Sequence, residues 1–98
     1  MKKEVVTARL TKNYDRIRRH HVNALYLFGS VVRAESTDRS DVDLLVEFDS
    51  DARIGLFEFS RLQRMLSEIL GCEVDLATTD SLHKSLKARI MKEAVHAI

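Results

Sequence analysis

The sequence has no proline, no low-complexity tract and no internal repeat among its 98 residues. Because such features mark linkers and repeat arrays, their absence predicts one domain over residues 1–98. Cys72 is the one cysteine, which excludes an internal disulfide and favours a reducing compartment. The formal net charge is +1, so the overall balance does not indicate a nucleic-acid-binding or membrane-surface protein.

Long hydrophobic runs are also absent. The N-terminal segment MKKEVVTARL has basic residues but no apolar core of signal-peptide length. No segment approaches the roughly 20 apolar residues of a membrane span. We therefore expect a cytoplasmic protein with no membrane segment. Its hydrophobic content of 45% and charged content of 32% are ordinary for a globular chain, so function has to be argued from motifs.

Hydrophobic residues at helical spacing predict three amphipathic helices. The first covers residues 5–21, and the second covers residues 55–70 with Gly71 as its C-cap. The third follows a cap at Asp80 or Ser81. The residues expected to face the core are Val6, Leu10, Tyr14 and Ile17 in the first helix, Phe59, Leu62, Leu66 and Ile69 in the second, and Leu82, Leu86 and Ile90 in the third.

Three short apolar segments predict strands, at residues 24–28, 41–48 and 72–78. Residues 30–40, between the first two, can form one or two helical turns followed by a loop turn. Helices and strands therefore alternate along the chain. This order predicts a small α/β or α+β fold, with a mixed sheet of three to four strands and helices packed on it.

Two aspartates interrupt the apolar pattern at the start of the second strand. Side chains two residues apart on a strand face the same side, so Asp41 and Asp43 project together, about 6.6–7 Å apart. Such a pair can bind one divalent cation, or two in the arrangement that supports phosphoryl transfer. Oxygen ligands favour Mg²⁺, with Mn²⁺ as the second choice. The simpler alternative is a strand end at which both carboxylates face water.

A Gly-Ser pair, Gly29-Ser30, ends the first predicted strand. A glycine there lets the backbone approach a ligand, and a following helix would direct N–H groups at a phosphate. Alone, the pair is typical of a turn with a capping serine. Gly-Ser, ten residues and Asp-x-Asp together should arise by chance in on the order of one random chain in a thousand.

The segment LFGSVVRAESTDRSDVDLLVEF resembles the signature of the DNA polymerase β-like nucleotidyltransferase superfamily. It is most similar to the minimal nucleotidyltransferases of the MNT antitoxin group, and the likeness covers nearly the whole chain. The resemblance implies the nucleotidyltransferase fold. It also implies a triphosphate held by Gly29 and Ser30, and Mg²⁺, as two ions, held by three carboxylates. These carboxylates are Asp41, Asp43 and Asp75.

Three further residues belong to this comparison. Arg33 matches an arginine that follows Gly-Ser in the family, where it can pair with phosphate. Ser40 is included with the nucleotide-binding candidates. The family usually has glycine after the arginine, whereas this sequence has Ala34, which affects the following turn rather than the metal site.

Asp75 also has an argument of its own. It lies between Val74 and Leu76 in an apolar strand, where a charge costs several kcal/mol unless it is paired or metal-bound. The alternative is an outward-facing residue on an edge strand beside Glu73. In the metal-site reading, Asp75 would orient or deprotonate an incoming hydroxyl.

The sequence thus predicts an Mg²⁺-dependent enzyme that transfers a nucleotide, AMP from ATP as the first choice, to a hydroxyl of another protein. The resemblance implies that this protein is a small helical HEPN toxin modified on tyrosine, with the present chain as antitoxin. The alternative is an inactive binding module that neutralises the toxin by occlusion. A nucleic-acid partner is not expected. No role is assigned to His20, His21, His83, His96, Cys72 or the basic residues of 9–19.

Overall fold

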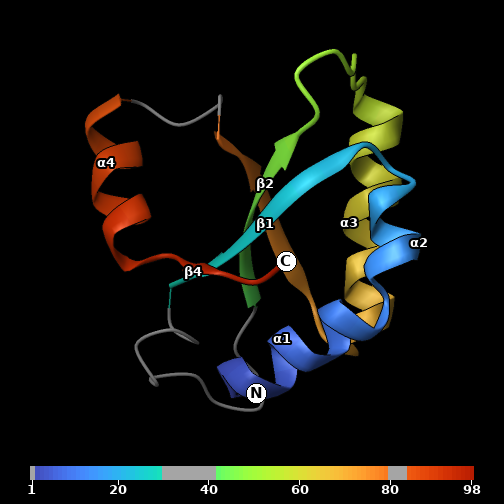
Figure 1. The fold of residues 1–98 in the computed structure, drawn as a ribbon, viewed down its shortest axis with the longest axis horizontal. Coiled ribbons are helices and arrows are strands. Elements are labelled where there is room, and N and C mark those ends of the chain that lie inside the picture. Colours follow the sequence, from blue (N-terminus) through green and yellow to red (C-terminus); the bar gives the residue numbers. More distant parts are fainter. Residues whose placement is uncertain (1, 30–41, 80–83) are drawn as a thin grey trace.

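The computed structural model describes residues 2–29, 42–79 and 84–98 as four helices and four strands (Figure 1). The strands form one sheet in the order β3-β2-β1-β4. β1 is antiparallel to β2 and β4, and β2 is parallel to β3, which confirms the predicted mixed α+β architecture. The elements are α1 (Lys3–Lys12), α2 (Tyr14–Arg18), β1 (Val22–Phe28), β2 (Val42–Phe48), α3 (Leu56–Leu70), β3 (Val74–Thr78), α4 (Lys84–Glu93) and β4 (Val95–His96).

One face of the sheet forms the hydrophobic core with α1, α2 and α3. Figure 1 shows these three helices on one side of the strands and α4 on the other. Side chains alternate between the two faces of a strand, so every second residue of β1 and β2 enters the core. The fully buried members include Leu25 and Leu27 of β1, Leu44 and Val46 of β2, and Leu62, Leu66 and Leu70 of α3.

The prediction of one continuous helix over residues 5–21 is wrong. It is divided into α1 and α2 at Asn13, whose φ of −105° and ψ of 20° depart from helical values. Tyr14, the first residue of α2, is 46% exposed instead of facing the core. The other three residues expected on this face, Val6, Leu10 and Ile17, are buried as predicted.

The second helix and the first two strands agree closely with expectation. α3 begins one residue after the predicted start, and Gly71 ends it in the left-handed region with φ of 70°, which confirms the C-cap. The guanidinium of Arg9 on α1 donates a 2.7 Å hydrogen bond to the carbonyl oxygen of Leu70. This contact satisfies a terminal carbonyl of α3 and fastens the two helices together.

The C-terminal part contains one element that the sequence did not predict. α4 agrees with the third predicted helix, but the two-residue strand β4 follows it and pairs with β1 at Tyr26 and Leu27. The expected caps Asp80 and Ser81, the expected core residue Leu82 and the predicted turns of residues 30–40 lie outside the described residues. Within the described part of the chain, no helix is long and apolar enough to cross a membrane.

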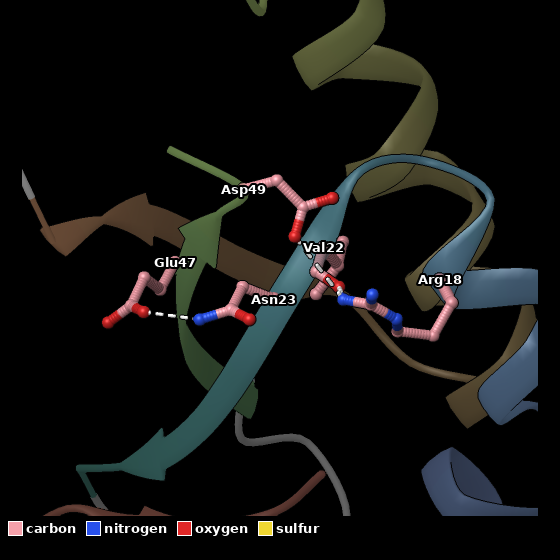
Figure 2. A network of polar contacts seen from close by, with 5 residues as sticks. All are labelled: Arg18, Val22, Asn23, Glu47 and Asp49. Atoms are coloured by element: carbon pink, nitrogen blue, oxygen red, sulfur yellow. Dashed lines mark hydrogen bonds and ion pairs between the residues drawn. The ribbon is translucent and has the colours of Figure 1, made fainter. Parts of the chain in front are cut away.

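A polar network holds β1 and β2 in register at the end where β1 begins (Figure 2). The guanidinium of Arg18 donates to the carbonyl oxygen of Val22 and lies 3.4 Å from Oδ1 of Asp49. The side-chain amide of Asn23 donates a 2.6 Å hydrogen bond to Glu47 across the strand pair. These contacts fix the strand pairing that carries through to the opposite end of β1.

We expect Arg18→Ala to lower the free energy of unfolding by about 1–2 kcal/mol, because it removes a hydrogen bond to a backbone carbonyl and a charged partner. Urea denaturation measures the change. Arg16→Ala is the matched control, since Arg16 makes only an exposed 3.8 Å ion pair with Glu68 and should cost less than about 0.5 kcal/mol. Equal losses in the two variants would contradict a fastening role for Arg18.

Candidate functional site

The end of β1 meets the start of β2, because the two strands are antiparallel. Phe28 pairs with Asp43, and Gly29 follows with φ of 79°. A Cβ atom built on Gly29 would lie 3.0 Å from the carboxyl carbon of Asp43 and still closer to its Oδ2. Glycine is therefore required twice over, by its positive φ and by the carboxylate beside it. The backbone of Gly29 therefore lies directly against the carboxylate of Asp43.

The second described carboxylate comes from the neighbouring strand. Asp75 of β3 is the register partner of Asp43 in the parallel β2–β3 ladder, so the two side chains project from the same face of the sheet. Asp43 is half-buried, whereas Asp75 is exposed on an edge strand. The expected burial cost at Asp75 is therefore wrong. Its position beside Asp43 is what connects it to the site.

Four further residues were predicted from the sequence to belong to the site. Ser30, Arg33, Ser40 and Asp41 all lie outside the described residues. Among the described residues alone, no group of three or more potential metal ligands is found. The structure therefore brings together Gly29, Asp43 and Asp75. The complete predicted ligand set also requires Asp41, which directly precedes β2 in the sequence.

The three placed residues are chemically suited to a cation and a phosphate. Two carboxylates on adjacent strands offer only oxygen atoms, the donors that Mg²⁺ prefers. They also repel each other, and a cation between them removes that repulsion. No side chain separates the backbone of Gly29 from Asp43, so an anionic group that binds this backbone would lie next to a cation held by Asp43. The donor set fits magnesium and does not fit a sulfur- or nitrogen-preferring metal such as zinc.

An aromatic pair lies on the face of the sheet that carries Asp43 and Asp75. Tyr26 of β1 and His96 of β4 are register partners, and their ring centroids are 5.2 Å apart with an interplanar angle of 36°. Sequence reasoning missed this pair because nothing in a two-residue strand announces its pairing with β1. The alternation of β1 alone would place Tyr26 on the face opposite Leu25 and Leu27.

A cavity of about 770 Å³ lies elsewhere, between the end of β2, the start of α3 and α4. Along β2 its wall begins at Val46, which is three residues from Asp43, or about 10 Å. Leu56 on its rim is 77% exposed. This cavity is therefore separate from the carboxylates, and neither Asp43 nor Asp75 lines it.

Comparison with known proteins agrees with the geometry. The sequence matches the nucleotidyltransferase domain family over residues 10–96. The protein adenylyltransferase MntA of Thermococcus cleftensis is 34% identical over 94 residues, which are 95% of this chain and 93% of that protein. A solved structure of a candidate minimal nucleotidyltransferase aligns with a TM-score of 0.81 at 33% identity, over 97% of this chain and 95% of the other.

The fold also occurs in a toxin–antitoxin assembly. A chain from the solved complex of tri-AMPylated Shewanella oneidensis HEPN toxin with MNT antitoxin aligns with a TM-score of 0.68. The alignment covers 95% of this chain and 71% of that one, at 19% identity. At this identity, the likeness establishes a shared fold.

We expect Gly29→Ala to lower the free energy of unfolding by about 2 kcal/mol or more, because it adds left-handed strain and a collision with Asp43. Gly55→Ala is the control, measured by the same urea titration. Gly55 has φ of −85°, and its new methyl group would meet only the flexible carboxylate of Glu58, so the loss should stay below about 1 kcal/mol. If both variants lose the same stability, the close approach of Gly29 to Asp43 is not a constraint.

Proposed function

Because the chain belongs to the nucleotidyltransferase domain family, we propose that it transfers AMP from ATP to a hydroxyl group of a partner protein. The observation that carries this proposal is that Gly29, Asp43 and Asp75 lie close together where β1 ends and β2 and β3 begin. It combines a glycine backbone, which can bind phosphate, with adjacent carboxylates for a cation. A relative that aligns over almost the full length of both chains is named as a protein adenylyltransferase.

Nucleotide binding in the proposed site begins at Gly29. Its backbone lies against the Asp43 carboxylate, so a triphosphate held there also lies against the metal ligands. Ser30 would add a hydroxyl donor to a phosphate oxygen, and Arg33 a charged one. Ser40 adjoins Asp41 and would contact the same triphosphate.

Asp41, Asp43 and Asp75 would hold Mg²⁺, as two ions in the full site. When bound, the metal neutralises charge that develops on the transferring phosphate and on the leaving group. The protein's own contribution is positioning, because phosphoryl transfer is catalysed largely by alignment and charge complementarity. Register-paired strands supply that alignment, since the backbone ladder fixes the spacing of Asp43 and Asp75.

The transfer step uses Asp75 as the group next to the acceptor. Its carboxylate accepts the proton of the incoming hydroxyl, or orients it, as the oxygen forms a bond to the α-phosphorus. The bond from that phosphorus to the β-phosphate bridging oxygen breaks, and pyrophosphate leaves with the electron pair. The exposure of Asp75 on an edge strand supports this role, because a hydroxyl on another protein can reach it.

The proposed acceptor is a small helical HEPN toxin, and the present chain is its antitoxin in the cytoplasm. The fold is shared with a chain of a complex in which a HEPN toxin carries three AMP groups. The competing function is occlusion, in which the chain neutralises the toxin by binding alone. A neighbouring reading frame that encodes a small helical protein with an Arg-x₄-His motif would identify the acceptor, and the experiments below use that protein.

The double variant Asp41→Asn/Asp43→Asn should lose measurable binding of ATP in the presence of Mg²⁺, because it keeps side-chain size but removes the charge of a hard-cation site. Isothermal calorimetry measures the binding. Melting temperature should hold or rise, since the two carboxylates repel without a cation. Asp51→Asn, in the exposed loop after β2, is the control. Unchanged affinity in the double variant would defeat the metal-site assignment.

Asp75→Asn separates catalysis from occlusion. Loss of its charge should slow AMP transfer by about 100-fold or more, the scale of a general base, while the partner still co-purifies with the variant. The mass of the partner after incubation with ATP and Mg²⁺ measures transfer, and cell survival measures neutralisation.

Glu73→Gln is the matched control for Asp75→Asn, because Glu73 is also exposed, acidic and two residues earlier on the same side of the chain. It should transfer AMP at the normal rate. If Asp75→Asn protects cells as well as the unaltered protein, occlusion suffices and the enzymatic function is wrong.

A further inference from the structure

The pair formed by Tyr26 and His96 occupies the sheet face of the carboxylates. Phe28 pairs with Asp43 and Tyr26 pairs with Leu45, so Tyr26 is one strand over and two residues along from Asp43. Strand separation and rise place the two Cα atoms about 8 Å apart. That spacing is comparable to the reach from the α-phosphate to the base of an extended nucleotide.

Both rings are accessible. His96 is exposed and Tyr26 is half-buried. Among the described residues, theirs is the one ring-to-ring contact, in a chain with only six Phe and Tyr residues. β4 positions His96 by pairing with β1, and Figure 1 shows β4 beside the end of β1 that leads to Gly29. The aromatic pair therefore adjoins the proposed phosphate position rather than the core formed with α1 and α3.

We propose that Tyr26 and His96 form the platform on which the base of the bound nucleotide stacks. This inference rests on the nucleotide site proposed above. A triphosphate at Gly29 lies beside Asp43 of the neighbouring strand, and the aromatic pair begins three residues back along β1, at Tyr26. The nucleoside then folds back over β1, while the acceptor hydroxyl approaches over the edge strand β3 at Asp75. Substrate and acceptor thus occupy opposite sides of Asp43.

Stacking predicts which bases the site prefers. Every base has a π-face, and stacking strength rises with the size of the ring system. A platform that reads bases by stacking favours purines over pyrimidines and discriminates weakly between adenine and guanine. ATP and GTP should therefore bind more tightly than CTP and UTP.

The test compares ATP with inorganic tripolyphosphate, each with Mg²⁺, by isothermal calorimetry. Tyr26→Leu and His96→Ala should each weaken ATP binding by about 5- to 100-fold, the range found when a stacking aromatic is removed. Tripolyphosphate binding should not change, because it has no base. Tyr26→Phe and His96→Phe keep the ring and should retain ATP affinity, which excludes a role for the hydroxyl or the imidazole nitrogens.

Tyr14→Leu and His20→Ala are the matched controls, since Tyr14 lies on α2 and His20 lies two residues after the end of that helix. His96→Ala is the variant least able to disturb folding, because the side chain is exposed. Unchanged ATP affinity in both ring-deleting variants overturns the inference, and so does an equal loss of tripolyphosphate binding. If the unaltered protein binds tripolyphosphate but gains nothing from the base, the stacking platform fails alone. If it binds neither ligand, the proposed function fails with it.

Discussion

The close approach of Gly29 to the carboxylate of Asp43 is the constraint on which the rest of the site depends. Antiparallel pairing of β1 with β2 places Phe28 opposite Asp43, and the next residue turns with a positive φ directly against that side chain. Any Cβ there would collide with the carboxylate. The β1–β2 register is therefore fixed at both ends, by this contact at one end and by the Arg18 and Asp49 network at the other (Figure 2). A slip of one residue would turn Asp43 to the other face of the sheet.

This arrangement gives each strand a separate task in the proposed reaction. β1 would supply the phosphate turn and Tyr26, β2 the proposed metal ligand Asp43, and the edge strand β3 would direct Asp75 towards the acceptor. β4 adds His96 to the nucleotide side. The core helices α1 and α3 lie on the opposite side of the sheet from α4, so they support the strands without contributing to the site (Figure 1). The cavity between β2, α3 and α4 begins about 10 Å along β2 from Asp43, at Val46, and has no role in the proposed reaction.

Much of the fold could be predicted because its local signals are strong. β1, β2 and α3 follow from apolar runs and helical spacing, and Gly71 ends α3 as expected. The division at Asn13 could not be predicted, since the apolar spacing continues through it and only the backbone reveals the turn. The strand β4 is defined by its pairing with β1, a long-range contact with no local pattern.

The proximity of three candidate site residues was predictable to a similar degree. Gly29, Asp43 and Asp75 were identified from motif spacing and family resemblance, and the sheet register brings them together. The burial argument for Asp75 was wrong, because sequence alone does not distinguish an edge strand from a central one. Tyr26 and His96 were not identified, since their contact exists only after β4 pairs with β1.

The central claim is that the chain transfers the α-phosphate of ATP, with its nucleoside, to another protein. The direct measurement is incubation of the helical partner with ATP, Mg²⁺ and this protein, using ATP labelled on either the α- or the γ-phosphate. We expect the partner to acquire label from α-labelled ATP only, with release of pyrophosphate. Label from the γ-phosphate, or no label from either nucleotide while the partner is still neutralised, would contradict it.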